Sequence, residues 1–210
     1  RTQLLLDAEA RKIPAMNGLW MLVAQAKEAA EWFTGSSLAD EKIARIHAAL
    51  RRQMENIILI GMPGCGKSTI GALLATKLSR EFVDIDFEIE KRIQMSICDF
   101  FAQKGEPAFR KIESEVLDEF TRKSGLVIAT GGGVIKNPKN RPLMSQNGIV
   151  VMLKRPLNEL ATDGRPISLS CSLEKLEQER LPIYNAWKDF DVACDIPDLT
   201  AERIINRLKI

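Results

Sequence analysis

Two patterns of apolar and polar positions divide the chain. From Asn56 onward, short and almost continuously apolar runs alternate with stretches in which apolar residues recur at helical spacing. Such runs are typical of strands covered on both faces, and we expect strands at residues 57–60, 126–129, 149–153 and 191–194, with a short one after the first that begins at 82–83. The stretches between and after them predict helices at 70–78, 109–120 and 199–208. Because crossovers between parallel strands are right-handed, this alternation predicts an α/β fold with a five-stranded parallel sheet between helices.

The first 54 residues are helical in pattern throughout and contain no strand-like run. Apolar side chains recur at helical spacing over residues 22–33, and the segment 34–37 (Thr-Gly-Ser-Ser) interrupts them. A second amphipathic stretch follows, with Ile43 and Leu50 on one face. We therefore predict an N-terminal helical extension that ends in a connector helix at residues 38–54.

Length and composition restrict the class of protein. The 210 residues suffice for one domain of ordinary size and an appendage, and the 45% hydrophobic content is that of a folded chain. Thirty basic residues against 28 acidic ones leave a net charge of +2 without a dense basic stripe, so no nucleic-acid partner is expected. The four cysteines lie far apart without metal-binding spacing, which is typical of a reducing compartment.

Targeting segments are not expected either. No run approaches the ~20 apolar residues that a membrane-spanning helix needs, and no signal peptide opens the chain. We therefore expect a cytoplasmic protein without a membrane partner. The first residue is Arg1 and not methionine, which suggests a fragment or a chain whose beginning was removed. The pattern indicates no particular oligomeric state.

A glycine-rich loop carries the clearest chemical signal. Residues 61–68 read Gly-Met-Pro-Gly-Cys-Gly-Lys-Ser, which matches the pattern GxxxxGK[ST] between an apolar strand and a helix. The glycines let backbone N–H groups turn inward around phosphate oxygens, and the helix N-terminus adds partial positive charge. Lys67 supplies a full charge, and the Ser68 hydroxyl suits Mg²⁺. The expected nucleotide-binding residues are Gly61, Gly64, Cys65, Gly66, Lys67, Ser68 and Thr69.

Two motifs predict polar groups beside this loop. Asp84-Ile85-Asp86 ends the second predicted strand, where residues two apart point to the same side, so both carboxylates can face the crevice at the edge of the sheet. Residues 131–133 (Gly-Gly-Gly) follow the third strand, where bare backbone can approach a ligand closely. Taken alone, the two carboxylates could equally be solvated turn residues.

Arginines supply the complementary charge. Arg110 and Glu113 lie three positions apart on a predicted helix and can meet side by side. Arg165 lies in a segment of weak periodicity suited to a mobile lid, and Arg180 lies late in a helical pattern. A guanidinium binds carboxylates and phosphates in a fork that lysine cannot match. The set therefore favours a small-molecule acceptor that carries an anionic group.

Together these motifs resemble the shikimate kinase family over about residues 55–210. GMPGCGKST, DID, FRKIE, the three glycines, the Arg-Pro pair at 165–166 and RLPIY occur in the family's order. The resemblance implies a P-loop fold like that of nucleoside monophosphate kinases, with strand order 2-3-1-4-5. It also implies transfer of the γ-phosphoryl group of ATP to the 3-hydroxyl of shikimate, with Mg²⁺ as cofactor and ATP and shikimate as partners.

The resemblance implies residue roles as well. Lys67, Asp86 and Arg165 are the expected catalytic residues, and Arg165 joins the loop residues in binding ATP. Ser68 and Asp84 are expected to hold Mg²⁺. The expected shikimate-binding residues are Asp86, Phe101, Phe109, Arg110, Glu113, Gly131, Gly132, Gly133 and Arg180.

One departure from the family concerns the adenine base. Between Leu160 and Arg165 the chain is short for this family, and the arginine that packs on adenine there is missing. Arg155, Pro197 or backbone groups are the candidates that could replace it. We therefore expect a high KM for the nucleotide.

Residues 2–35 are similar to the closing segment of the shikimate dehydrogenase family. The stretch NGLWMLVAQ matches that family's NGLxMLxxQ, which implies that Gln25 corresponds to a substrate-binding glutamine and that Gly18 and Met21 correspond to positions near the nicotinamide. The family's catalytic pair and dinucleotide-binding loop do not occur in this chain. No dehydrogenase activity is therefore expected from it.

These resemblances suggest a fused dehydrogenase–kinase polypeptide with three parts. Residues 1–37 are the expected remnant of the dehydrogenase-like domain, 38–54 the connector helix and 55–210 the kinase domain. The alternative is that residues 1–54 are helices that pack on the kinase or form a dimer contact. Two alternatives concern the function: a P-loop kinase for gluconate or a nucleotide acceptor, and a nucleotide-binding regulatory module without turnover.

Overall fold

The computed structural model describes residues 2–160 and 173–209, which fall into two compact units. We call Arg1–Glu55 the helical unit and Asn56–Ile210 the sheet unit. Within the described ranges, no helix combines the length and the apolar character that crossing a bilayer requires.

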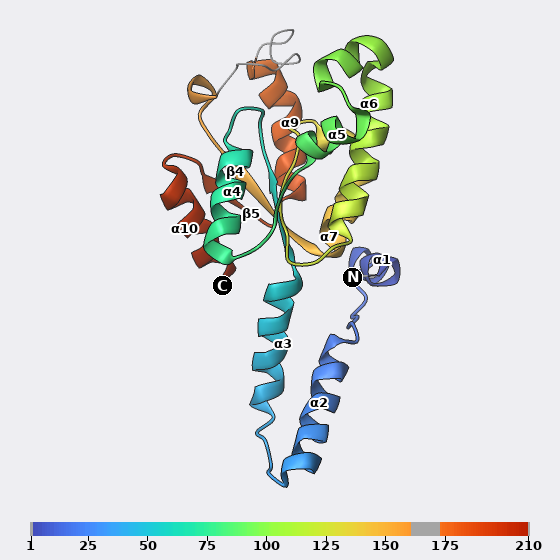
Figure 1. The fold of residues 1–210 in the computed structure, drawn as a ribbon, viewed down its shortest axis with the longest axis vertical. Helices are drawn as coiled ribbons and strands as arrows, with labels where there is room; N and C mark the ends of the chain where they lie inside the picture. Colours follow the sequence, from blue (N-terminus) through green and yellow to red (C-terminus); the bar gives the residue numbers. More distant parts are fainter. Residues whose placement is uncertain (1, 161–172, 210) are drawn as a thin grey trace. The chain divides into compact units, whose positions relative to one another are not determined.

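A five-stranded parallel sheet organises the sheet unit (Figure 1). In the order β2-β3-β1-β4-β5 it contains strands β1 (Asn56–Ile60), β2 (Phe82–Asp84), β3 (Val127–Ala129), β4 (Gly148–Lys154) and β5 (Phe190–Ala193). The central strand β1 pairs with both neighbours, since Ile58 lies opposite Ile128 of β3 and Val150 of β4. The predicted α/β fold and strand order are confirmed.

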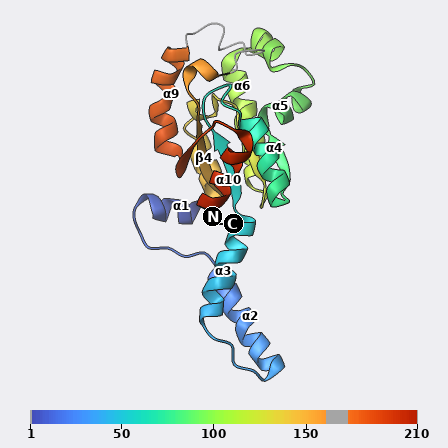
Figure 2. The ribbon, with the colours of Figure 1, turned by 90° about the vertical axis from the view of Figure 1, so that its left-hand side faces the viewer.

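Helices flank this sheet. They are α4 (Lys67–Leu78), α5 (Ile85–Ile93), α6 (Ile97–Thr121), α7 (Asn140–Gln146), α9 (Leu173–Trp187) and α10 (Pro197–Leu208), with short 3-10 turns η1 (Val134–Lys136) and η2 (Leu157–Glu159). α4 packs against α10, and α6 packs against α5 and α7. In Figure 1, α4 lies to the left of the strands and α6 to their right, and Figure 2 shows the unit from the side of α10. The helix predicted at 109–120 is the second part of α6, which bends at Gly105, where φ is +77°.

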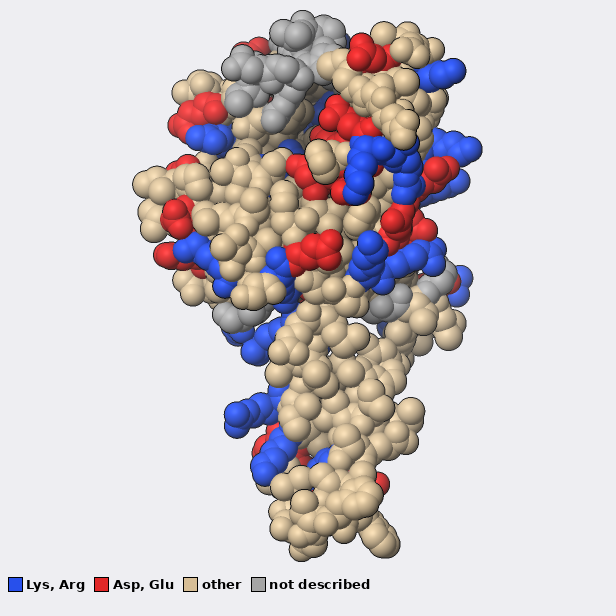
Figure 3. Space-filling view, viewed as in Figure 1, with Lys and Arg blue, Asp and Glu red and all other residues tan. Residues whose placement is uncertain are grey.

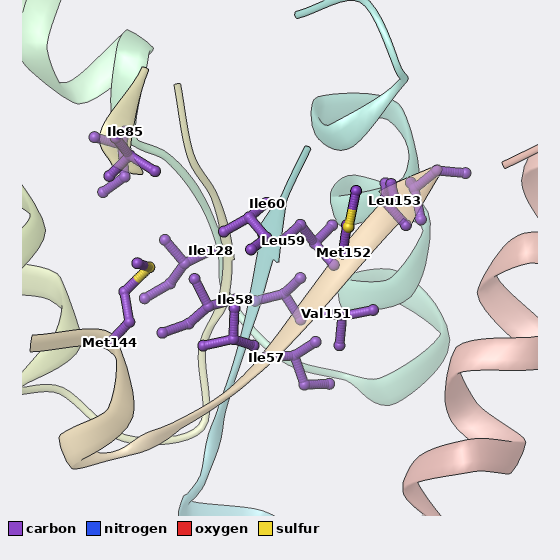
Figure 4. Close-up of a cluster of buried hydrophobic side chains, with 14 of the residues drawn as sticks. Ile57, Ile58, Leu59, Ile60, Ile85, Ile128, Met144, Val151, Met152 and Leu153 are labelled. Carbon is purple, nitrogen blue, oxygen red and sulfur yellow. The ribbon is translucent and has the colours of Figure 1, made fainter. Parts of the chain in front are cut away.

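The hydrophobic core surrounds the central strand. Residues 57–60 of β1 are fully buried, and Figure 4 shows their side chains beside Ile128 of β3 and Val151 of β4. Because both faces of β1 are covered, the strand is apolar without alternation. The parallel strands end at the same edge of the sheet, and the loops that follow them can therefore build one site there.

The helical unit consists of α1 (Gln3–Ala10), α2 (Leu19–Thr34) and α3 (Glu41–Met54). α2 ends at Gly35, whose φ of +65° is in the left-handed region that favours glycine. Lys27 of α2 forms ion pairs with Glu31 at 3.2 Å and Asp40 at 2.8 Å. These contacts and the packing of α2 on α3 hold the two helices together.

Candidate active site

The phosphate loop lies between β1 and the start of α4, as its sequence predicts. Gly61, Gly64 and Gly66 all have positive φ values, of +144°, +82° and +98°. At Gly61 a Cβ would also lie 2.6 Å from the carbonyl oxygen of Leu153. The loop therefore requires glycine at these positions, both for its backbone conformation and for its close approach to β4.

Lys67 and Ser68 open α4 beneath this loop. The Lys67 ammonium donates hydrogen bonds to the carbonyl oxygens of Gly61 at 3.0 Å and Met62 at 2.9 Å, and the residue is 8% exposed. The Ser68 hydroxyl donates to Asp84 Oδ2 at 2.5 Å. A cation and two oxygen ligands are thus gathered at the helix N-terminus, which itself favours anions.

The paired aspartates differ from the prediction in their local structure. β2 ends at Asp84, and Asp86 lies in the first turn of α5, so the two do not share a strand. Asp84 Oδ1 accepts hydrogen bonds from the backbone N–H groups of Asp86 at 3.0 Å and Phe87 at 3.4 Å. An aspartate that caps a helix in this way ends the strand. Both carboxylates nevertheless line the same cavity.

Arg110 is held between two carboxylates. Its Nε and Nη2 donate to Glu106 Oε1 at 3.1 and 2.9 Å, and its Nη1 donates to Glu113 Oε2 at 2.8 Å. Lys136 also binds Glu106 Oε1, at 2.9 Å. Gly133 leaves space for the guanidinium, because a Cβ there would lie 2.3 Å from Arg110 Nη2. Both carboxylates therefore fix the orientation of this arginine.

Glu113 is a buried carboxyl group with one oxygen that lacks a hydrogen-bond partner among the described residues. It is 1% exposed, and the oxygen without a partner there is Oε1. Burial raises the pKa of this carboxyl to about 7, although Arg110 opposes the shift and Asp86 adds to it. A Cβ on Gly131 would lie 2.6 Å from Asp86 Oδ1 and 3.0 Å from Glu113 Oε1, so this glycine lets the two carboxylates approach.

Arg180 presents a guanidinium with unused donors. Its Nη1 donates to the Gly132 carbonyl oxygen at 2.9 Å, and Tyr184, one turn later on α9, donates its hydroxyl to the same oxygen. Arg180 is 3% exposed, and its Nε and Nη2 are buried without a hydrogen-bond partner. Buried donors of this kind are costly unless a ligand satisfies them. An anion with two oxygens would fit that requirement.

Most of these groups border one cavity of about 460 Å³. Of the predicted site residues it brings together Gly64, Gly66, Lys67, Ser68, Thr69, Asp84, Asp86, Phe101, Phe109, Arg110, Glu113, Gly131, Gly132, Gly133 and Arg180. The phenyl rings of Phe101 and Phe109 pack at 4.6 Å between centroids and form an apolar wall. Gly61 and Cys65 are buried but do not line the cavity. Arg165, with its neighbours 164 and 166, lies outside the described residues.

Sequence reasoning missed several residues of this site. Glu90, Ile97, Cys98 and Thr130 line the cavity, and Glu106 and Tyr184 position lining residues. The four-residue spacing of Glu106 and Arg110 predicts their ion pair, because residues four apart face each other on a helix. Tyr184 belongs to the RLPIY motif and lies four positions after Arg180, but its hydrogen bond goes to the Gly132 carbonyl, 52 positions away, which helical spacing does not predict.

The oxygen ligands at the phosphate loop suit Mg²⁺ bound together with a nucleotide better than a metal ion held by protein ligands alone. Within the described part of the chain, no three His, Cys, Asp or Glu side chains gather in a way that could hold a metal. Ser68 Oγ and Asp84 Oδ2 are hard oxygen ligands at the phosphate loop. Mg²⁺ is commonly bound by one or two protein oxygens together with phosphates and water. These two residues therefore fit a magnesium ion that accompanies a nucleotide.

The residues expected to be a dehydrogenase remnant belong to the helical unit. Gly18 precedes α2, and Met21 and Gln25 lie exposed on that helix. None of the three lines the cavity described above.

Known proteins resemble the chain mainly over the sheet unit. The sequence pattern of the shikimate kinase family matches residues 63–209. The shikimate kinase of Caldicellulosiruptor bescii is 37% identical over 164 residues, which cover 73% of this chain and 95% of that protein. The shikimate kinase of Buchnera aphidicola subsp. Schizaphis graminum is 41% identical over 158 residues, which cover 68% and 88%. The solved structure of shikimate kinase from Acinetobacter baumannii in complex with shikimate matches with a TM-score of 0.70 and 33% identity, over 77% of this chain and 97% of that one.

Proposed function

Because the chain belongs to the shikimate kinase family, we propose that it transfers the γ-phosphoryl group of ATP to the 3-hydroxyl of shikimate. The products are ADP and shikimate 3-phosphate. The observation that carries the choice of acceptor is the buried pair of unused donors on Arg180, in the same cavity as the phosphate loop. These donors match a carboxylated acceptor, and shikimate carries a carboxylate.

The phosphate loop binds the nucleotide in this proposal. Backbone N–H groups of residues 64–69 receive the phosphates, and Lys67 exchanges its bonds to the Gly61 and Met62 carbonyls for phosphate oxygens. Ser68 and Asp84 would hold Mg²⁺, which would supply charge that neutralises the phosphates. Arg165 is expected to act on the same phosphates; it lies outside the described residues, and its role stays a prediction from the motif.

The acceptor is held at the other end of the cavity. Arg180 and Arg110 bind its carboxylate, and Glu113 keeps Arg110 in place. Asp86 lies beside the Gly131 backbone and binds the ring hydroxyls, orienting the attacking oxygen. Phosphoryl transfer has a loose transition state, so this positioning and the surrounding charge account for most of the catalysis. The two phenyl rings of the apolar wall exclude water from the ring of the acceptor.

A coupled assay of ADP release tests this function. We expect ADP release in the presence of Mg-ATP and shikimate, and only a small background when shikimate is left out. Gluconate and a nucleoside monophosphate serve as alternative acceptors. Turnover with either of them and not with shikimate would overturn the assignment. Nucleotide binding without turnover on any acceptor would favour the regulatory module.

For the helical unit we propose descent from a dehydrogenase fused to this kinase. The support is the similarity of residues 2–35, in particular Gly18, Met21 and Gln25, to the closing segment of shikimate dehydrogenases. The three-part division at residues 37 and 54 belongs to the same proposal. Sequencing the gene upstream of the codon for Arg1 tests it. A reading frame there without dehydrogenase motifs would contradict the fusion.

A further inference from the structure

Arg155 lies at a distinctive position in the sheet unit. It directly follows β4, and it lines the cavity together with the phosphate loop. In the sheet order β2-β3-β1-β4-β5, β4 is the neighbour of β1 on the side opposite β3. The acceptor groups proposed above lie on the β2–β3 side, because Asp86 follows β2 and residues 131–133 follow β3. Arg155 therefore borders the opposite end of the cavity.

The contacts of Gly66 place this arginine against the phosphate loop. A Cβ on Gly66 would lie 3.9 Å from Arg155 Nη1 and 3.4 Å from the thiol sulfur of Cys194, which follows β5. The β4–β5 side of the loop is thus bordered by Arg155 and Cys194. For transfer to the acceptor, the γ-phosphate must point toward the β2–β3 side. The nucleoside then leaves the loop on the side of Arg155.

Exposure and bonding together distinguish Arg155 from the other three described cationic lining residues. Lys67 binds loop carbonyls, Arg110 lies between two carboxylates, and Arg180 binds the Gly132 carbonyl. Arg155 Nε is buried without a hydrogen-bond partner, and its ion pair with Glu159 Oε2 is long, at 3.5 Å. Its side chain is 30% exposed. The guanidinium is therefore accessible to a ligand and only loosely held by protein groups.

We propose that Arg155 binds the nucleoside end of the nucleotide, with its planar guanidinium stacked on the base. This inference rests on the proposed function and specifies its nucleotide site. A guanidinium stacks on aromatic rings in a way that an ammonium does not. Of the candidates considered for the base, Pro197 is not among the described lining residues, whereas Arg155 is. Arg155 thus takes the place of the arginine that the short segment after Leu160 lacks.

Calorimetric binding of two ligands, Mg-ADP and Mg-pyrophosphate, tests the proposal on the full chain. For Arg155→Met we expect the Kd of ADP to rise about tenfold, the scale of one desolvated stacking contact. The Kd of pyrophosphate, which has no base, should change less than about twofold. Arg155→Lys should behave like Arg155→Met because lysine keeps the charge but loses the plane. Lys154→Met is the matched control, since Lys154 pairs with Asp191 and does not line the cavity.

Three outcomes would overturn the proposal. Unchanged ADP binding in Arg155→Met would exclude a contact with the nucleotide. Equal weakening of ADP and pyrophosphate would place the contact on the phosphates, and full recovery in Arg155→Lys would make it a simple charge effect. Since neither ligand requires shikimate, failure of the proposed function would show separately, as absent shikimate-dependent ADP release by the unsubstituted chain.

Discussion

Apolar residues recur at helical spacing in both units of the chain, but most of them are buried only in the sheet unit. In the sheet unit, α6 buries Phe120 to 7% exposure and α10 buries Ile204 completely. In the helical unit, α2 leaves Leu22 60% exposed and Trp32 and Phe33 each 90% exposed. Among the described residues of the helical unit, Val23 is the one buried apolar side chain, at 4% exposure. Helical periodicity therefore specifies a helix, whereas burial requires a second surface that fits its apolar face.

Charge follows the same division. Figure 3 shows acidic and basic side chains interspersed over the visible face of the sheet unit, and few charges on the visible face of α2. Within the sheet unit, charged groups also enter the interior: Lys67, Glu113 and Arg180 are all less than 9% exposed. Burying charge is costly unless a partner or a ligand compensates it. The sheet unit carries this cost at its cavity, which is where function is expected.

The largest effect that distinguishes the units should come from Lys67. We expect Lys67→Met to lower kcat by about a thousandfold, because a fully charged donor to the transferring phosphate is lost. The measurement is steady-state ADP release with saturating shikimate and varied Mg-ATP. Among the described residues, buried Lys67 bonds to the carbonyls of Gly61 and Met62 and to the Cys65 sulfur, and to no carboxylate, so its charge is available to the nucleotide.

Lys27→Met in the helical unit is the matched control. Lys27 forms two ion pairs, with Glu31 and Asp40, but none of the three lines the cavity. Its substitution should leave kcat and both KM values within about twofold, since none of its ion-pair partners contacts a ligand in that cavity. Equal losses in the two variants would contradict the assignment of activity to the sheet unit alone.

A second contrast concerns pH, because the two units hold carboxyls shifted in opposite directions. Burial raises the pKa of Glu113 to about 7, so the folded protein retains a proton there that the unfolded chain loses near 4.5. Stability from this group is complete below pH 4.5 and is lost as the pH rises through 7. Relative to Glu113→Gln, the unsubstituted protein should lose up to about 3 kcal/mol of unfolding free energy between pH 4.5 and 8. Urea unfolding of the ligand-free protein measures this.

Glu31 of the helical unit provides the opposite case. A backbone hydrogen bond from Leu38 and a side-chain bond from Lys27 lower the pKa of Glu31. Its contribution is therefore present above its unfolded pKa and is lost as the pH falls toward acid. At neutral pH the unsubstituted protein should therefore exceed Glu31→Gln in unfolding free energy, and this difference should shrink only as the pH falls into the acidic range. A Glu113→Gln difference that stays flat from pH 5 to 8 would mean that Glu113 is ionised throughout.

Much of the sheet unit could be read from the sequence because local and global requirements agree there. β1 and β4 are covered on both faces and are continuously apolar, and the phosphate loop has a fixed place between strand and helix. The error at Asp84 and Asp86 has a specific cause. Period-two spacing predicts a strand that ends at Asp86, whereas Asp84 caps α5 and the strand ends two residues earlier.

Contacts between distant segments could not be predicted in this way. Tyr184 and Gly132 are 52 positions apart, and only the topology of the sheet brings the hydroxyl to that carbonyl. The raised pKa of Glu113 likewise depends on burial by segments far away in the sequence. In the helical unit the pattern predicted the helices of 19–34 and 41–54 well, but not that their apolar side chains stay exposed.

A smaller effect on the KM for shikimate should distinguish residues of the sheet unit that position Arg180 from residues that only stabilise the fold. Tyr184→Phe removes one of the two donors to the Gly132 carbonyl, the group that orients Arg180. We expect the KM for shikimate to rise about fivefold with kcat and the KM for ATP nearly unchanged, the scale of one neutral hydrogen bond. Steady-state kinetics with each substrate varied in turn measures the change.

Thr121→Val is the control for this substitution. It removes another buried hydroxyl, which donates to the Leu117 carbonyl at 2.8 Å away from the cavity. Both variants should lose about 1 kcal/mol of unfolding free energy, but Thr121→Val should leave the KM for shikimate unchanged. A Tyr184→Phe protein that is destabilised without a change in KM would reduce Tyr184 to a structural role.

The smallest expected effect tests the exposed face of the helical unit directly. Phe33→Ser should change the unfolding free energy by less than about 0.5 kcal/mol, because a side chain that is 90% exposed loses little burial. The same substitution at Phe120, 7% exposed in the core of the sheet unit, should cost about 3–5 kcal/mol. Kinase activity of Phe33→Ser should match that of the unsubstituted chain, since Phe33 does not line the cavity. If Phe33→Ser instead costs more than about 1 kcal/mol of unfolding free energy, another surface covers the Phe33 ring in solution. The two units would then both bury their apolar residues, and the contrast between them would disappear.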